Sequence, residues 1–470
     1  MSRQNRRKPV SLENIEIVNT ASKGKSVAKH EGRVIFVKGG VPGDICNITV
    51  FKKRKKYWEA NIDKIIQKST HRIDPECSHF GTCGGCKWQN MTYASQLQFK
   101  QDEVLNNLSK IGGVSITKFN KILGSKKELN YRNKMEFTFS NKRWLTKEEI
   151  KNEDEIIDKN ALGFHVPGMF DKVINLEKCH LQEEPSNKIR NSVREFALKN
   201  NLTFFDIRNQ EGLLRNLMIR TSRNNQLMVL VQFYHDDSKK IKLLMNFIKN
   251  SFKEITSLLY TINTKANNTI YDQKIICFDG NDHITENIED LIFKIGPKSF
   301  FQTNSEQAEI LYRSARDLAD IKKEDIVYDL YTGTGTIAQF VARDAKRVIG
   351  IDSVVEAIEA AKESAKFNDI KNCDFFSGDM KNIFTDEFIT QNGKPNLIIT
   401  DPPRDGMHKK VIEQIKKIKP KKIIYISCNS ATQSRDISLL NDLYEIKNMQ
   451  TVDMFPQTHH VENILILELR

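Results

Sequence analysis

Two residues near the end of the chain have side chains suited to covalent chemistry. Cys428 follows a short apolar run, 421–427, that is typical of a buried strand. A cysteine in such a place is most often a small apolar residue, but its thiolate is a soft nucleophile where a substrate requires one. Glu462 precedes the apolar run 463–469, and a carboxylate there is either solvated surface or a general base.

A glycine-rich loop supplies a candidate cofactor site. The sequence Asp329-Leu-Tyr-Thr-Gly-Thr-Gly-Thr336 follows a predicted strand and opens a predicted helix, and Asp352 ends the next strand. Gly333 and Gly335 allow the backbone to turn sharply and approach a ligand, while the acid after the second strand can accept hydrogen bonds from ribose hydroxyls. A nicotinamide dinucleotide would fit this pattern too.

Two further acids favour a different cofactor. Asp379 follows the third predicted strand, where it would meet an adenine amino group, and Asp401-Pro-Pro-Arg404 ends the fourth. Ligands of open α/β sheets bind at these carboxyl ends. We therefore expect S-adenosylmethionine rather than a hydride carrier.

A thiol, a carboxylate and a methyl donor fit one reaction. Carbon 5 of uracil is too weak a nucleophile to accept a methyl group directly. Addition of the Cys428 thiolate to carbon 6 would create an enolate whose carbon 5 can attack the methyl sulfonium. The hydrogen on carbon 5 must then be removed by a general base, for which Glu462 is the candidate.

Three cysteines form a tight cluster much earlier in the chain. Cys77, Cys83 and Cys86 are separated by five and two residues, with glycines among them. This spacing predicts a metal-ligand loop, and zinc and an iron-sulfur cluster both use four cysteines. Radical use of S-adenosylmethionine would need a first gap of three residues, so we expect an ordinary closed cluster. The fourth sulfur could come from any of Cys46, Cys179 and Cys277.

Charge and composition narrow the class of protein. Lys and Arg number 73 against 60 Asp and Glu, a net charge of +13, and residues 1–75 hold 17 of the basic and 7 of the acidic side chains. This basic N-terminal part favours a polyanionic partner. The 39% hydrophobic and 28% charged fractions are globular values that exclude collagen-like and wholly disordered chains. With no apolar run of about 18 residues, we expect a cytoplasmic protein without a membrane partner.

The N-terminal part predicts a nucleic-acid-binding barrel. Residues 15–66 contain short alternating apolar stretches separated by turn signals at 38–40 and 42–44. The basic run 52–56, followed by Tyr57 and Trp58, places phosphate-binding charge beside stacking rings. A solvated hairpin edge protected by lysines would have a similar sequence.

The rest of the chain divides into two patterns. A helix is predicted from Tyr93 to about Ile111, and residues 130–290 mix β-like stretches with helices. From about Phe293 strands alternate with helices, which predicts a mostly parallel sheet.

Together these motifs resemble the RNA (uracil-5-)-methyltransferases of the RumA and TrmA type, over nearly the whole chain. Residues 15–66 resemble a TRAM domain, an OB-like RNA-binding barrel. Residues 77–88, with Cys-Gly-Gly-Cys-Lys-Trp, are similar to the family's [4Fe-4S] loop. The resemblance implies that Cys179 is the fourth ligand of the cluster.

The resemblance also implies roles in the last module. Ser299-Phe-Phe-Gln-Thr-Asn304 is similar to a segment in which Gln302 would contact the methyl donor and Phe300 would pack on the target base. Asp401 would meet both cofactor and uracil, Cys428 would be the nucleophile and Glu462 the base. The other implied cofactor residues are Tyr331, Thr336, Asp352 and Asp379.

Two departures from the family pattern stand out. Ser430 occupies the position of a usual proline after the fifth strand of the predicted sheet. Thr332 and Thr336 stand where cysteine and asparagine are common. Neither change removes a chemical group that the reaction requires.

The expected architecture is therefore α/β, with three modules. Residues 1–70 would form a TRAM-like OB barrel, 71–290 an α+β central domain with the iron-sulfur cluster, and 291–470 a doubly wound Rossmann-like class I methyltransferase domain. Residues 91–125 could pack with the last of these.

The resemblance favours 23S ribosomal RNA as the partner, because relatives that act on transfer RNA tend to lack both the barrel and the cluster. A transfer RNA uracil methyltransferase and a non-catalytic RNA-binding scaffold are the alternatives. No obligate protein partner is inferred.

Overall fold

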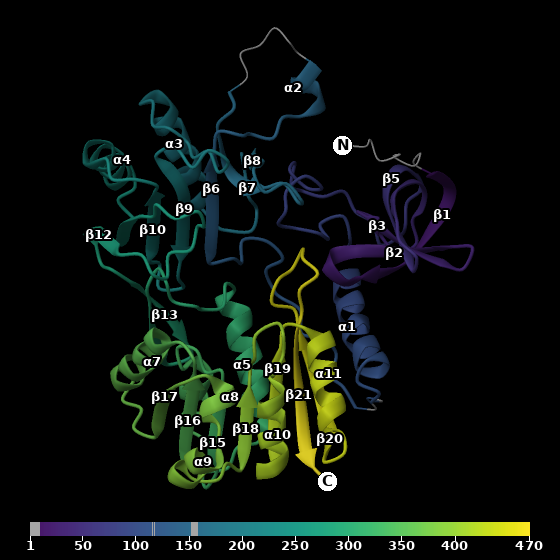
Figure 1. Cartoon of the computed structure of the whole chain (residues 1–470), viewed down its shortest axis with the longest axis vertical. Coiled ribbons are helices and arrows are strands. Elements are labelled where there is room, and N and C mark those ends of the chain that lie inside the picture. Colours follow the sequence, from purple (N-terminus) through teal and green to yellow (C-terminus); the bar gives the residue numbers. More distant parts are fainter. Residues whose placement is uncertain (1–9, 115, 117, 152–157) are drawn as a thin grey trace, which may run out of the picture.

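Three folded parts make up the chain in the computed structural model, which describes residues 10–114, 116, 118–151 and 158–470 (Figure 1). A β-barrel and an α+β central domain lie at one end, and an α/β domain lies at the other. Residues 1–9 of the predicted barrel module lie outside the described residues. None of the helices in the described ranges is both long and apolar enough to cross a membrane.

The N-terminal barrel is closed by five strands in the order β1-β2-β3-β5-β4. Its interior is apolar because alternate side chains, including Ile17, Ile35 and Ile48, point inward and are fully buried. The predicted barrel is confirmed, but it begins earlier than Ile15, because Val10 already pairs with Val50. The elements are β1 (Val10–Ala21), a 3₁₀ turn (Ser22–Gly24), β2 (Lys25–His30), β3 (Arg33–Lys38), β4 (Ile45–Lys53) and β5 (Tyr57–Gln67).

The central domain is built on a mixed seven-stranded sheet in the order β12-β11-β10-β9-β6-β7-β8. One face, which carries Phe137 and Val229, packs on helices α3 and α4. The other face, which carries Met218 and Leu230, packs on the hairpin β13–β14 and the C-terminal core. The elements are β6 (Lys134–Ser140), α2 (Lys147–Lys151), β7 (Ala161–His165), β8 (Val173–Asn175), α3 (Ser186–Lys199), β9 (Leu214–Thr221), β10 (Leu227–Phe233), α4 (Ser238–Ser251), β11 (Ser257–Ile262), β12 (Ile275–Gly280), β13 (Ile284–Ile288) and β14 (Leu291–Ile295).

The C-terminal domain is a seven-stranded sheet in the order β17-β16-β15-β18-β19-β21-β20. Its first five strands are parallel, as the alternation of strands and helices predicts, and β21 is inserted antiparallel between β19 and β20. The elements are α5 (Ser305–Ala319), β15 (Ile326–Leu330), α6 (Thr336–Ala342), β16 (Arg347–Asp352), α7 (Val355–Phe367), β17 (Cys373–Ser377), α8 (Met380–Ile383), α9 (Asp386–Asn392), β18 (Leu397–Thr400), α10 (Lys409–Ile418), β19 (Lys422–Ser427), α11 (Ser430–Leu440), β20 (Tyr444–Val452) and β21 (Glu462–Leu469).

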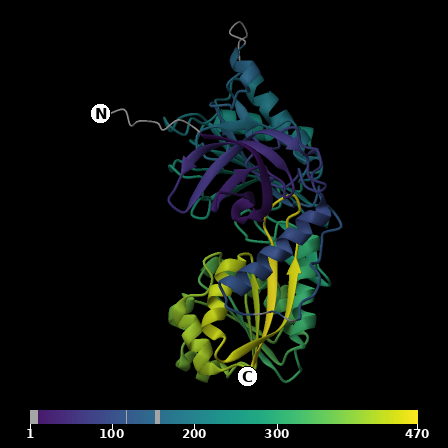
Figure 2. The same ribbon diagram turned by 90° about the vertical axis from the view of Figure 1, so that its right-hand side faces the viewer.

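Helix α1 (Tyr93–Lys110) belongs in space to the C-terminal domain, although it lies far from it in sequence (Figure 2). It packs against α11, and the Asn107 side chain donates a hydrogen bond to the Ser430 hydroxyl over 2.8 Å. The serine that replaces the family's usual proline therefore has a partner on α1. A bridge between Leu123 and Val452 continues this attachment along β20.

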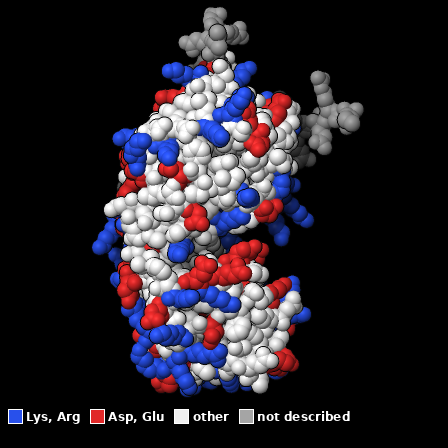
Figure 3. All heavy atoms as spheres, turned by 90° about the vertical axis from the view of Figure 1, so that its left-hand side faces the viewer, with Lys and Arg blue, Asp and Glu red and all other residues white. Residues whose placement is uncertain are grey.

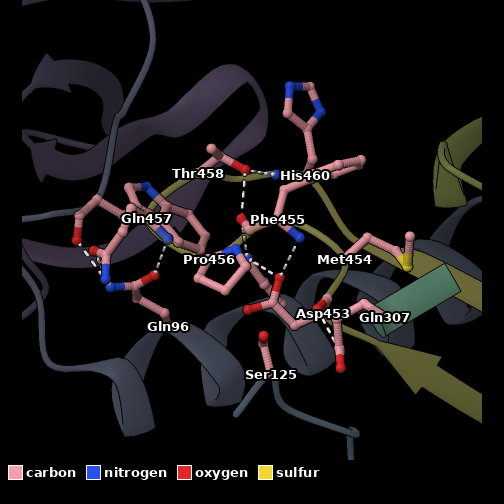
Figure 4. Close-up of polar contacts among 12 residues, drawn as sticks. Gln96, Ser125, Gln307, Asp453, Met454, Phe455, Pro456, Gln457, Thr458 and His460 are labelled. Atoms are coloured by element: carbon pink, nitrogen blue, oxygen red, sulfur yellow. Dashed lines mark hydrogen bonds and ion pairs between the residues drawn. The ribbon is translucent and has the colours of Figure 1, made fainter. Parts of the chain in front are cut away.

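The loop that connects β20 to β21, residues 453–461, is held by α1 (Figure 4). The Lys100 ammonium contacts the Asp453 carboxylate at 2.6 Å, and both side chains are fully buried. The Gln96 side chain both donates to the Gln457 side chain and accepts from its backbone amide, at 3.0 and 2.9 Å. The connecting loop is thus fixed by buried polar contacts that span more than 350 residues of sequence.

We expect Lys100→Met to lower the free energy of unfolding by about 3–5 kcal/mol, because it leaves the buried Asp453 carboxylate without its cation. Urea denaturation followed by circular dichroism measures this. The matched control is Lys409→Met, which breaks an exposed pair with Glu413 on α10 and should cost less than about 0.5 kcal/mol. Equal effects of the two substitutions would contradict the anchoring role of Lys100.

Candidate active site

Strand register brings Cys428 and Glu462 to the same edge of the C-terminal sheet. Strands β19 and β21 are antiparallel, and Ser427, the last residue of β19, pairs with Asn463. The next residue along β19 is Cys428, and the preceding residue on β21 is Glu462. The nucleophile and the base predicted from sequence are therefore neighbours across two adjacent strands.

Asp401 joins this pair from the strand on the other side of β19. It directly follows β18, which runs parallel to β19, so both strands end at the same edge. Its charge acts on both partners, because it contributes to raising the pKa of Cys428 and that of Glu462. The two predicted catalytic residues and Asp401, the acid predicted to meet cofactor and uracil, thus lie at one edge of the sheet.

The site disfavours negative charge. Burial raises the pKa of the Cys428 thiol to about 11, with Glu462 and Asp401 adding to the shift and Arg404 opposing it. Burial also raises the pKa of Asp401 to about 7 and that of Glu462 well above its usual range. A positively charged group bound among them would favour their ionised forms.

The glycine-rich loop has the backbone of a ligand cradle. Tyr331, Gly333 and Gly335 all have left-handed backbones, with φ of 65°, 55° and 72°. A side chain at Gly335 would collide with the Phe375 ring, whereas one at Gly333 would meet no atom within 4 Å. The Gly333 amide donates to the Asp352 carboxylate over 2.9 Å, so the acid after the second strand fixes the turn.

The acidic side chains around this loop differ in their hydrogen-bond and ion-pair partners. Asp329 accepts a 2.5 Å hydrogen bond from the Thr332 hydroxyl, while its other oxygen is buried without a partner among the described residues. Burial raises its pKa to about 7. Asp379 caps α8 and pairs with Lys381 at 2.9 Å, which lowers its pKa. Thr332 therefore contributes a structural hydrogen bond where the family commonly has cysteine.

Thr336, the remaining loop residue predicted to contact the cofactor, is the first residue of α6 and is 8% exposed. Its hydroxyl lies 3.3 Å from that of Thr334. This places Thr336 at the amino end of the helix that the glycine-rich turn opens.

The predicted substrate segment is held by the central domain. The Asn133 side chain donates to the Gln302 carbonyl over 2.9 Å, and the Arg220 guanidinium donates to the Ser299 carbonyl over 3.0 Å. Between these two anchors the Phe300 side chain is 69% exposed. The segment thus presents an accessible aromatic ring from a fixed backbone.

Tyr312 on α5 is a residue near the site that no sequence pattern indicated. This side chain is 6% exposed. Burial raises its pKa, with the Asp401 and Glu462 charges adding to the shift and the Gln302 side chain opposing it. Because Tyr312 lies on the buried face of an amphipathic helix, its spacing in the sequence resembles that of a core residue.

The predicted cluster cysteines occupy one neighbourhood. Burial raises the pKa of Cys83 to about 11 and that of Cys86 to about 12, with the Cys77 and Cys179 thiols adding to both shifts. The Gly85 amide approaches the Cys83 sulfur at 3.4 Å, and the Gln89 side chain approaches the Cys86 sulfur at 3.2 Å.

The structure separates this group from the two other candidate cysteines. Cys46 is buried in the barrel core, and Cys277 is exposed on β12. Within the described ranges, no three His, Cys, Asp or Glu side chains are arranged to hold a metal ion. Cys179 is therefore the candidate that lies with the cluster loop, but the arrangement of the described residues supports neither a zinc site nor the predicted [4Fe-4S] cluster.

Comparisons with known proteins agree with the fold. The family model described as tRNA (Uracil-5-)-methyltransferase matches residues 268–470. A protein of Bacteroides thetaiotaomicron named as an uncharacterized RNA methyltransferase is 52% identical over 453 residues, covering 96% of this chain and 100% of its own. One of Porphyromonas gingivalis with the same description is 48% identical over 460 residues, covering 96% and 99%.

A solved structure resembles nearly the whole chain. The Pyrococcus abyssi tRNA (uracil-54, C5)-methyltransferase, in complex with S-adenosyl-L-homocysteine, matches with a TM-score of 0.73 and 25% sequence identity. The match covers 96% of this chain and 100% of that one.

The C-terminal domain thus has the fold of the S-adenosylmethionine-dependent α/β methyltransferases. The chain belongs to the RNA (uracil-5-)-methyltransferase family. Its activity is S-adenosylmethionine-dependent methylation of RNA, of the uracil carbon-5 type. The family predicted from the motifs is confirmed, and a nicotinamide-dependent oxidoreductase is excluded.

The environment of Cys428 predicts a specific pH dependence for its alkylation. In the free protein, the rate with iodoacetamide should keep rising up to about pH 11, the pKa of the buried thiol. Glu462→Gln should move this midpoint to lower pH, because it removes a carboxylate that opposes thiolate formation. Peptide-resolved mass spectrometry measures the rate, with the exposed Cys277 as the internal reference. The assigned environment would be contradicted if both proteins showed a midpoint of about 8.5, which is the usual pKa of a free thiol.

Proposed function

We propose that this protein methylates carbon 5 of a uridine in 23S ribosomal RNA through a covalent adduct with Cys428. The observation that carries the proposal is the register of β19 and β21, which places the Cys428 thiol beside the Glu462 carboxylate. Two groups with opposite tasks, one that adds to the ring and one that removes a proton from it, need this proximity.

The proposed reaction begins with the target base splayed out of the RNA, since its ring atoms are otherwise inaccessible. The Cys428 thiolate forms a bond to carbon 6 and shifts the electron pair of the 5,6 double bond toward carbon 5. After carbon 5 has gained its methyl group, Glu462 takes the remaining proton from that carbon. The electron pair released re-forms the double bond and expels the Cys428 thiolate. Loss of the proton from Glu462 to solvent then returns the protein to its starting state.

Two residues beside the reacting pair would hold the base. Phe300 has an accessible ring on an anchored backbone and can stack on the pyrimidine. Asp401, with its pKa raised to about 7, can share a proton with the polar edge of uracil. Both belong to the substrate residues predicted from sequence.

The loop between β15 and α6 fits S-adenosylmethionine, which would supply an electrophilic methyl group. The backbone at Gly333 borders open space, and the unpartnered oxygen of Asp329 is an acceptor at the end of β15. Asp352 ends β16 and Asp379 follows β17, where ribose and adenine donors would be met. Gln302, Tyr331, Gly335 and Thr336 complete the set of residues that we assign to the cofactor.

The barrel and the adjoining surface support an RNA partner. The Arg33 guanidinium and the Lys53 ammonium each lie 4.9 Å from the centre of the Trp58 ring. Stacking rings flanked by cations suit single-stranded RNA. Figure 3 shows a recess between the central and C-terminal domains, with basic side chains above it and acidic side chains on its lower border.

Transfer RNA is the second candidate substrate. It is favoured by the match over 96% of the chain to a solved enzyme named for transfer RNA uracil-54. Ribosomal RNA is favoured only by the family resemblance, because the match to the transfer RNA enzyme covers 96% of this chain and therefore includes most of the barrel and the cysteine loop.

We also propose that Cys77, Cys83, Cys86 and Cys179 hold a [4Fe-4S] cluster. The amide donors at the Cys83 and Cys86 sulfurs are the kind that tune such clusters. Since uracil methylation involves no net electron flow, the cluster would serve to shape the RNA-binding surface.

Covalent trapping tests the proposed reaction. Transcripts of 23S ribosomal RNA and of transfer RNA, each with 5-fluorouridine for uridine, are incubated with the protein and S-adenosylmethionine. We expect a denaturation-resistant adduct with the ribosomal transcript, because fluorine on carbon 5 cannot be removed as a proton. Gel electrophoresis under denaturing conditions measures the adduct.

The control variants separate the possible outcomes. Cys428→Ala should abolish the adduct, whereas Cys277→Ala, which changes an exposed cysteine on β12, should leave it unchanged. An adduct with transfer RNA alone would identify transfer RNA, and not ribosomal RNA, as the substrate. An adduct that survives Cys428→Ala would refute the assigned nucleophile.

The cluster proposal predicts brown protein after anaerobic purification, with about four irons per chain and broad visible absorption. Cys179→Ser should remove much of this absorption, because it takes away one of four ligands. Cys46→Ser, at a cysteine in the barrel core, is the control that should retain it. Colourless protein containing stoichiometric zinc would overturn the assignment.

A further inference from the structure

A pocket of about 270 Å³ lies on the face of the central sheet that is turned away from α3 and α4. Its floor consists of alternate residues on three neighbouring strands, because side chains on one face of a sheet recur at every second position. Loop residues 268–271 and the pair 297–298 form its sides. The floor residues are Lys134, Glu136, Asn216, Met218, Leu230 and Gln232.

The floor of the pocket contains apolar side chains and one polar atom without a hydrogen-bond partner among the described residues. Met218 lies between Glu136 and Leu230 in the strand register. The side-chain oxygen of Asn216 is buried and has no hydrogen-bond partner among the described residues. Such an acceptor is costly to leave unpaired, so a rotation of the Asn216 amide that presents it to a ligand N–H group would be stabilised.

The side of the pocket is a rigid loop. Arg215 is fully buried, and its guanidinium donates to the carbonyls of Asn263 and Lys265 and to the Asn268 side chain, each over 2.6 Å. At the end of this loop the Tyr271 side chain is 70% exposed. A fixed loop that presents an accessible ring at the rim of a pocket is suited to stacking on a flat ligand.

The pocket adjoins the segment assigned to the target base. Lys298 lines the pocket and precedes Phe300 by two residues, so their Cα atoms are at most about 7 Å apart. Lys298 forms no ion pair with the acidic side chains of the described ranges, which leaves its charge available to a phosphate. Successive nucleotides of one RNA strand could therefore reach both places.

We propose that this pocket, here called the amide pocket, binds a second unstacked base of the RNA, within one or two nucleotides of the target uridine. This rests on the proposed function, because Phe300 marks the place of the target. Its volume suits a single base rather than a larger ligand. Tyr271 would stack on the base and Lys298 would contact the adjacent phosphate.

The chemistry of the floor selects among the bases. Asn216 offers an unpaired acceptor, and the Glu136 carboxylate, which pairs with Lys134 at 2.7 Å, lies diagonally across from it on the same face. Adenine, guanine and cytosine carry exocyclic amino groups that donate to such acceptors, whereas uracil has a single ring N–H. The amide pocket therefore prefers a base with an amino group.

Ligand-observed NMR with the four nucleoside 5′-monophosphates tests this on the full chain. S-adenosylhomocysteine is present at saturation so that the cofactor loop does not compete. We expect AMP, GMP or CMP to bind at least about fivefold more tightly than UMP. Tyr271→Ala should weaken that binding by about 5- to 100-fold, because it removes the stacking ring.

Three further variants locate the binding. Tyr271→Phe retains the ring and should bind like the wild type, and Asn216→Leu should remove the preference for amino-bearing bases. Phe367→Ala, which removes an exposed ring from α7, is the matched control and should change nothing. Because Tyr271 is exposed, its replacement leaves the core intact.

The proposal is overturned if none of the four nucleotides binds, if UMP binds as tightly as the others, or if Tyr271→Ala and Asn216→Leu bind like the wild type. These binding measurements do not depend on methyl transfer. Failure of the proposed function would appear instead as the absence of a Cys428 adduct with either RNA, even where the amide pocket binds its nucleotide.

Discussion

The antiparallel pairing of β19 with β21 is the constraint on which the site depends. A parallel sheet alone would place Cys428 and Asp401 at one edge, but it would contribute no base from the last strand. Because β21 runs the other way, its first residue, Glu462, reaches the edge where β19 ends. A change of register by one residue would turn the Glu462 side chain to the opposite face of the sheet.

Several distant parts of the chain support this register. The connecting loop before Glu462 is tied to α1 by the buried pair of Lys100 and Asp453. The substrate segment is tied to the central domain by Asn133 and Arg220. The site is therefore a product of the central and C-terminal domains, and the central domain contributes to it by fixing the backbone of the substrate segment.

Much of the architecture follows from local patterns in the sequence. Alternating apolar residues predict the barrel, and alternation of strands with helices predicts the parallel sheet with its cofactor loop. What local patterns cannot supply is non-local pairing. The packing of α1 on α11, the buried role of Lys100 and the approach of Cys179 to Cys83 each join residues about 100 or more positions apart in the chain. Tyr312 could not be predicted because the sequence pattern of a buried helix position does not show which polar side chains from other elements lie next to it.

The central claim is that Cys428 and Glu462 act on the same pyrimidine ring. Its most direct test is a single-turnover reaction on RNA whose uridines carry tritium at carbon 5, in which methyl transfer and tritium release are measured together. Wild-type protein should release one tritium for each methyl group transferred. Glu462→Gln should transfer the methyl group and retain the tritium in a covalent complex. Release of tritium by Glu462→Gln at the wild-type rate would contradict the account.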